Sequence, residues 1–91
     1  MDRNARLEYV NSIRNNIENC VHGEESLYDF FEGSIYGEDS DGNYIIGYGV
    51  SGSSNVVLST ECVMFGDVES EPFSEETSFA LKEFKDSLDN C

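Results

Sequence analysis

The sequence predicts an α+β fold, in which an N-terminal helix, a C-terminal helix and one short helix pack on one face of a three-stranded antiparallel sheet. Two observations predict it. Both terminal segments repeat apolar residues at three- and four-residue steps, as amphipathic helices do. The middle of the chain alternates apolar and polar residues around a hairpin signal. A chain of 91 residues is long enough for one domain, 1–91, with a single two-layer core.

The first predicted helix covers residues 4–21. We expect Asp2 or Asn4 to cap its N-terminus and Gly23 to end it. Its apolar stripe consists of Leu7, Val10, Ile13, Ile17 and Cys20. Its outer face carries basic residues: Arg3, Arg6 and Arg14.

Two further helices are predicted. A short one over residues 24–32 begins with acids, which the helix dipole favours at an N-terminus, and ends at Gly33. It turns Leu27, Phe30 and Phe31 inward. The last helix follows Ser74 as its N-cap. Its inward stripe consists of Thr77, Leu81, Phe84 and Leu88.

The three strands are predicted from turn chemistry and alternation. Asp41-Gly42 suits a two-residue hairpin turn, which would pair Ile35 with Tyr48, Gly37 with Ile46 and Asp39 with Tyr44. A second turn is expected at 51–55 and a third strand at 56–65, followed by an acidic loop at 66–72. The charged side chain of Glu61 predicts that the strand face on which it lies is the more solvent-exposed of the two. The residues of that face are Val57, Ser59, Glu61, Val63 and Phe65.

Charge is the strongest signal in this sequence. Nineteen acidic residues against five lysines and arginines give a net charge of −14. The 59 residues from Gly23 to Leu81 hold thirteen of the carboxylates and no lysine or arginine. Self-repulsion on this scale reduces the stability of the compact state and exceeds what solubility requires. The distribution therefore favours a function for the acidic surface over a merely solvated one.

The N-terminal residues lack an apolar run, so no signal peptide and no membrane association are expected, and a cytoplasmic location is predicted. Three cysteines cannot all pair within one chain, and their spacing does not match a zinc site. We expect reduced thiols and a monomer, or a weak dimer bridged by oxidation of Cys91.

Motifs for catalysis or cofactor binding are weak. The acidic stretch beginning at Asp39 resembles the start of a calcium-binding loop, but Tyr44 replaces the required glycine and Val50 the closing glutamate. His22 has no nucleophile or base placed around it by the sequence. The glycines at 47, 49 and 52 precede no helix that could cradle a phosphate. We predict no metal, no cofactor and no enzymatic activity.

We therefore predict a protein-binding module whose partner is a basic nucleic-acid-binding protein. Direct binding to nucleic acid is not expected, because phosphates would be repelled. The acids mimic the charge of a nucleic acid, and tyrosines supply rigid aromatic contacts. The predicted partner-binding residues are Tyr36, Glu38, Asp39, Asp41, Glu61, Asp67, Glu69, Glu71, Glu75 and Glu76.

In size, charge and order of elements, the chain resembles the small acidic bacteriophage proteins that inhibit host nucleases, in particular the anti-CRISPR proteins that mimic DNA. That resemblance implies an inhibitor that occupies the DNA- or RNA-binding groove of a Cas effector. Two alternatives stay open: an immunity protein for a nuclease toxin, and a structural or regulatory protein of a phage or plasmid whose acidity is incidental.

Overall fold

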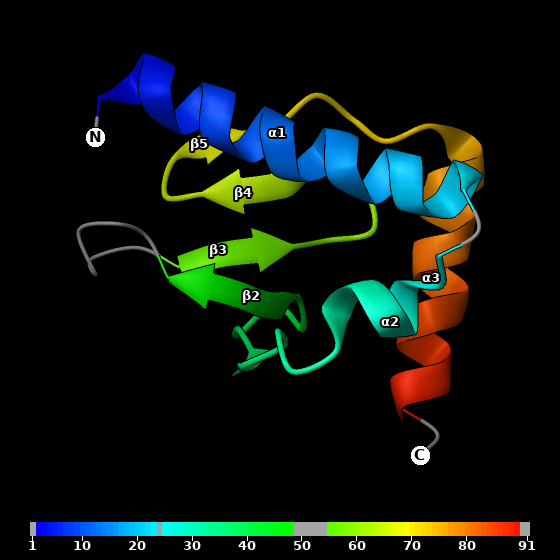
Figure 1. Ribbon diagram of the computed structural model, residues 1–91. Helices are drawn as coiled ribbons and strands as arrows, with labels where there is room; N and C mark the ends of the chain where they lie inside the picture. Colours follow the sequence, from blue (N-terminus) through cyan, green and yellow to red (C-terminus); the bar gives the residue numbers. More distant parts are fainter. Residues whose placement is uncertain (1, 24, 49–54, 90–91) are drawn as a thin grey trace.

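The computed structural model describes residues 2–23, 25–48 and 55–89 (Figure 1). The helices are α1 (Arg3–His22), α2 (Leu27–Phe31) and α3 (Glu75–Asp89). The strands are β1 (Gly37–Glu38), β2 (Tyr44–Tyr48), β3 (Asn55–Leu58), β4 (Val63–Phe65) and β5 (Val68–Glu69). The α+β class and the antiparallel sheet are confirmed. The sheet has five strands in the order β1-β2-β3-β4-β5, so the prediction of three strands was wrong.

The extra strands arise from two tight turns. The predicted strand at 56–65 is divided at residues 59–62, where the Ser59 hydroxyl accepts hydrogen bonds from the backbone N–H groups of Glu61 (3.1 Å) and Cys62 (3.0 Å). A side chain thus stabilises a turn that contains no glycine, proline or asparagine. The second turn lies at Gly66-Asp67, where Gly66 has φ +65° and joins β4 to β5. The predicted acidic loop at 66–72 therefore contains a short strand.

The turn at 59–62 also changes which side chains are buried. Val56 and Leu58 on β3 and Val63 and Phe65 on β4 are all buried. The prediction that Val63 and Phe65 lie on the more solvent-exposed face was therefore wrong. The alternation of faces was predicted for one continuous strand, whereas the chain reverses direction between β3 and β4.

The hairpin at Asp41-Gly42 exists, but its register differs by one residue from the prediction. Gly37 pairs with Ile45 and Glu38 with Tyr44. The Asp39 N–H donates to the Asn43 carbonyl at 2.9 Å, which leaves three residues in the loop instead of two. The shift places Glu38 on the face of the buried Tyr44. The predicted turn at 51–55 lies, apart from Asn55, outside the described residues.

Replacing Gly42 with alanine should reduce the free energy of unfolding by about 1 kcal/mol, because Gly42 has φ +82° and side chains disfavour that conformation. The nearest atom to an added Cβ is Lys85 Nζ at 3.7 Å, so space is not limiting. Gly47→Ala is the matched control, since its Cβ would lie at 3.8 Å from Val56 without strain. Urea unfolding measures both. If the two variants lost equal amounts of unfolding free energy, the positive φ of Gly42 could not be the cause of the loss.

The helices follow the predictions closely. Asp2 is the N-cap of α1, its carboxylate accepting from the Ala5 N–H at 2.8 Å. In the predicted stripe of α1, Leu7 is 40 % exposed, while three of its members are buried: Val10, Ile17 and Cys20. The second helix is shorter than the predicted 24–32, because Ser26 caps its N-terminus. The Ser74 hydroxyl accepts from the Thr77 N–H at 3.3 Å and begins α3.

The core lies between one face of the sheet and the helices. In Figure 1, α1 runs along β4 and β5, which it contacts, and α3 stands at the end of the strands. The core cluster consists of Val10, Ile17, Phe31, Val56, Leu58, Val63, Phe65, Val68, Phe73, Leu81 and Phe84. Because all described helices contribute to this cluster or pack on it, the opposite face of the sheet is the one they leave uncovered.

Candidate functional site

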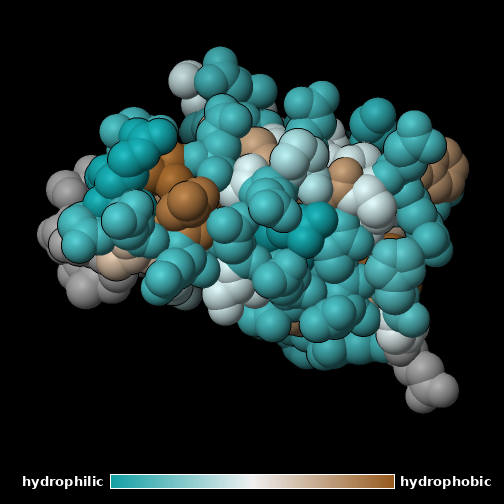
Figure 2. All heavy atoms as spheres, turned by 90° about the horizontal axis from the view of Figure 1, so that it is seen from above, coloured by the Kyte–Doolittle hydropathy of each residue, from teal (hydrophilic) through white to brown (hydrophobic). Residues whose placement is uncertain are grey.

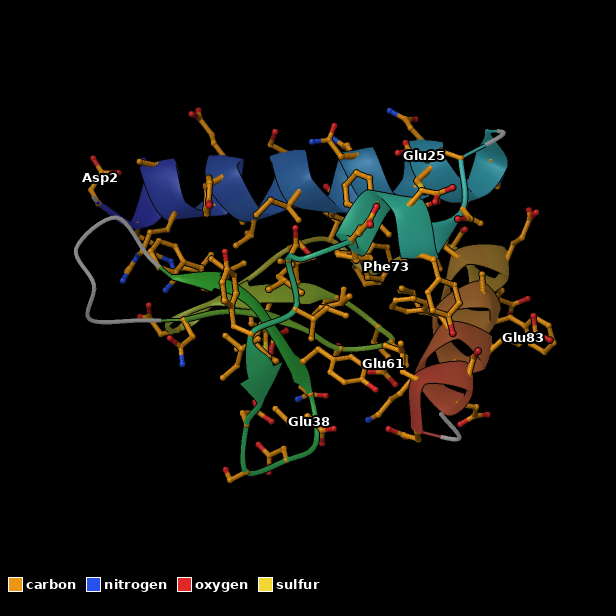
Figure 3. All side chains as sticks on the ribbon, turned by 60° about the horizontal axis from the view of Figure 1, so that its bottom comes forward. Asp2, Glu25, Glu38, Glu61, Phe73 and Glu83 are labelled. Carbon is orange, nitrogen blue, oxygen red and sulfur yellow. The ribbon has the colours of Figure 1, made fainter. Side chains whose placement is uncertain are left out.

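The predicted interface begins at the hairpin tip, which projects from the sheet where Figure 3 labels Glu38. Asp39 directs one carboxylate oxygen into its own turn, accepting from the N–H groups of Asp41 (3.0 Å) and Asn43 (2.9 Å). This bonding fixes the loop, as aspartate commonly does in turns. Glu38 and Asp41 are exposed. The tip therefore combines one carboxylate that shapes the loop with two that face solvent.

The hairpin tip and the β4–β5 turn meet at one hollow. Asp39, Asp41 and Gly66 line this hollow of about 350 Å³ together with three residues of the sheet: Asn55, Val57 and Met64. The pairing of β2 with β3 shifts its register between Ile45 and Gly47, close to this hollow. The acids of the hairpin tip thus share this hollow with Gly66 of the β4–β5 turn, whereas the acid of that turn, Asp67, does not line it.

Two more predicted residues extend this surface. Glu69 pairs with Met64 across β4 and β5, and Glu61 lies in the turn between β3 and β4. Glu61 and Glu69 border a second hollow, whose other residues are Cys62, Ser70, Pro72, Phe73 and Ser78. We name the group of Asp39, Asp41, Glu61 and Glu69 the sheet-face acids. Within the described part of the chain, none of them has an ion pair with a lysine or arginine.

Other predicted residues lie apart from this group. Asp67 faces α1, where its carboxylate contacts Arg6 at 3.0 Å and Arg3 at 3.8 Å. Glu75 and Glu76 begin α3, and Glu76 lies 3.5 Å from His22. The tertiary structure thus returns positive charge to part of the acidic segment that the sequence leaves without any.

Of the remaining predicted contact residues, Glu71 lies near α1 and Tyr36 lies beside the hairpin. The backbone N–H of Glu71 donates to Asn11 of α1 at 2.9 Å, which ties this residue to the helix side. Tyr36 is 58 % exposed beside the hairpin, whereas Tyr44 is only 6 % exposed and cannot serve as an aromatic contact on the surface. Burial, assisted by the nearby carboxylates of Asp89 and Glu38, raises the pKa of Tyr44 to about 12.

Sequence reasoning missed the most strongly bonded carboxylate. Glu18 accepts from the Ser74 N–H (2.7 Å), the Ser74 hydroxyl (3.2 Å) and the Thr77 hydroxyl (2.7 Å), so it joins α1 to the start of α3. Partial burial acts to raise the pKa of Glu18, but these hydrogen bonds and the charge of Arg14 outweigh it and hold the pKa below its usual value. The four-residue spacing of Arg14, Glu18 and His22 was the available signal.

A second missed contact connects α3 with the hairpin. Lys85 Nζ donates to the Gly42 carbonyl at 2.6 Å and lies 5.7 Å from the centre of the Tyr44 ring. Lys85 therefore acts as a brace for the loop, and the side chains of Glu38 and Asp41 form no ion pair with a lysine or arginine in the described structure.

The two cysteines that the structure describes, Cys20 and Cys62, show no feature of reactive thiols. Cys20 is buried and donates to the Glu25 carbonyl at 3.3 Å. Burial raises the pKa of both Cys20 and Cys62, which disfavours the thiolate. Cys91 lies outside the described residues. Between residues 2 and 89, leaving out the undescribed positions, no three histidine, cysteine or acidic side chains lie together in an arrangement that could hold a metal.

Comparisons with known proteins add no family to this description. No family model, curated protein or solved structure matches the chain. The resemblance to DNA-mimicking anti-CRISPR proteins therefore stays a prediction. Among the described residues, no helix is both long enough and apolar enough to span a membrane.

Proposed function

We propose that this protein is an inhibitor that binds the nucleic-acid-binding groove of a basic protein, such as a CRISPR effector of the host cell, and competes there with the nucleic acid. The observation that supports this proposal best is the separation of charge. The sheet-face acids and the hairpin tip lack ion pairs with lysine or arginine in the described structure, whereas Arg3, Arg6 and Arg14 are bonded on the α1 side.

The proposal follows from the physics of nucleic-acid binding. Double-stranded DNA carries one negative charge per roughly 1.7 Å of its axis, and proteins that bind it neutralise these charges with lysine and arginine. A rigid sheet that holds carboxylates at fixed positions offers the same sign of charge to those side chains. Complementary charge increases the rate of association and makes binding sensitive to salt.

A competition measurement tests the function. A panel of purified guide-loaded CRISPR effectors and nuclease toxins is presented with labelled target nucleic acid, and this protein is added at increasing concentration. Displacement of the nucleic acid from an effector, weakened at high salt, is the expected result. Displacement only from a nuclease toxin would instead support the immunity-protein alternative. Absence of displacement from every member at low salt would contradict nucleic-acid mimicry.

Reversing charge at the hairpin tip should weaken this binding several-fold, roughly fivefold, while leaving thermal stability unchanged or higher. Glu38→Lys with Asp41→Lys is the variant to use, because both side chains are exposed and the Asp39 carboxylate that shapes the loop is preserved. Glu8→Lys with Glu83→Lys is the matched control, with the same change of net charge at exposed sites on α1 and α3 (Glu83 is labelled in Figure 3).

Affinity is measured by anisotropy competition and stability by thermal unfolding. An equal loss of affinity in the tip variant and in the control would mean that only net charge matters. That result would contradict a specific role for the hairpin tip.

A further inference from the structure

The face of the sheet that the helices leave uncovered carries a continuous apolar row. Ile45 pairs with Val57, Val57 with Met64, and Met64 with Glu69. Residues directly opposite one another share a face, so the apolar side chains of Ile45, Val57 and Met64 cross three adjacent strands in one line, and Glu69 continues that line on the fourth. Their neighbours along the strands are buried in the core on the opposite face: Val56, Leu58, Val63, Phe65 and Val68.

This row is neither part of the core nor fully covered. Ile45, Val57 and Met64 are partly buried, yet none belongs to the core cluster or to the residues packed against it. Val57 and Met64 instead line the hollow that the hairpin tip borders. Methionine is an adaptable apolar contact for a partner surface.

Acids surround the row. Asp39 and Asp41 lie at the hollow beside Val57, and Glu69 ends the row next to Met64. None of these carboxylates has an ion pair with a base in the part of the chain that the structure describes. An apolar centre with a charged rim is the usual composition of a protein-binding surface. Because the rim is negatively charged, we expect the partner to be positively charged at this surface.

We propose that the uncovered sheet face is the docking surface for a protein that places an apolar side chain on Val57 and Met64 and lysines or arginines against the sheet-face acids. The proposal deepens the proposed function, on which it rests, by naming the surface and the chemistry of the partner. A second copy of this chain does not fit, because it would bring the same acids together on molecules of net charge −14.

Another exposed apolar patch, on α1, has the wrong surroundings for a basic partner. Figure 2 shows hydrophobic atoms over the N-terminal half of α1, where Leu7 is 40 % exposed. That half of the helix also carries Arg3 and Arg6. A basic partner is therefore attracted to the sheet face and not to α1, which makes Leu7 a suitable site for a matched control.

Two synthetic peptides test the surface without knowledge of the natural partner. One alternates lysine with leucine, and the other, of the same length and charge, alternates lysine with serine. We expect the lysine–leucine peptide to bind roughly tenfold more tightly, since one apolar side chain becomes buried. In amide NMR spectra, its addition should shift the signals of Ile45, Val57, Met64 and Glu69.

Variants of this protein separate the apolar part of the interaction from its electrostatic part. Val57→Thr with Met64→Gln preserves size while removing apolar surface, and should abolish the preference for the leucine peptide without changing the salt dependence. Leu7→Gln, the control on α1, should leave the preference intact. Asp41→Lys with Glu69→Lys should instead reduce the dependence of affinity on salt.

The outcomes separate this proposal from the proposed function. Equal affinity for the two peptides, or shifts centred on α1 or α2, would overturn the docking surface. Peptide binding on the sheet face, together with failure of every effector and nuclease in the competition panel, would preserve the surface and overturn nucleic-acid mimicry. If this protein displaces nucleic acid from an effector, and the variant Val57→Thr with Met64→Gln displaces it equally well, the docking surface alone would be overturned.

Discussion

Replacing Phe84 with alanine is expected to reduce the free energy of unfolding by about 3–5 kcal/mol, most of the stability that a small domain has. Phe84 is 6 % exposed and joins α3 to α2 through ring contacts with Phe31 (5.8 Å between centroids) and Tyr28 (5.0 Å). It also borders a small cavity of about 70 Å³ beside Tyr44 and Leu58. Deleting the ring enlarges a cavity that already exists. The neighbouring side chains are therefore not expected to fill the space, and the loss of stability should be near the upper end of this range.

Thermal and urea unfolding measure the loss, which should lower the melting temperature by roughly 15–25 °C. Phe79→Ala is the control, because Phe79 lies on the same helix but is 63 % exposed. Its effect should stay within about 0.5 kcal/mol. Similar losses in the two variants would show that α3 is not held by the core through Phe84.

Replacing Glu18 with glutamine is expected to reduce the free energy of unfolding by about 2 kcal/mol at neutral pH. The carboxylate accepts three hydrogen bonds from Ser74 and Thr77 and lies 3.5 Å from Arg14. Hydrogen bonds to a charged group contribute about 1.5–3 kcal/mol, and the amide places a donor where the surrounding groups already donate. The start of α3 should therefore loosen from α1.

The effect should depend on pH in a defined direction. Because the pKa of Glu18 is lower in the folded protein than its ordinary value of 4.5, its stabilisation is complete above that value. It is lost as the pH falls through the folded-state pKa. The difference between the wild-type protein and Glu18→Gln should thus be constant near neutral pH and shrink on acidification.

Urea unfolding at several pH values measures this difference. Glu8→Gln is the control, with an exposed carboxylate on the same helix that has no hydrogen bond or ion pair in the described structure. Its difference from the wild-type protein should be small at every pH. A pH-independent deficit in Glu18→Gln would show that shape, and not charge, is what Glu18 contributes.

The two long helices and the hairpin could be predicted from the sequence because their signals are local. The spacing of Val10 and Ile17, and of Leu81 and Phe84, places each pair on one side of a helix whatever surrounds it. Gly42 has the positive φ that the turn requires. The acidity is likewise a property of composition.

The five-stranded sheet, its register and the grouping of the acids were decided by tertiary structure. The turn after β3 depends on the Ser59 hydroxyl, not on a glycine or proline, so no composition signal marks it. Asp67 and Glu69 are two residues apart, yet Arg6 neutralises the first while the second ends an apolar row. Which carboxylate is paired depends on how α1 packs against β4 and β5, and distance along the chain carries no information about that contact.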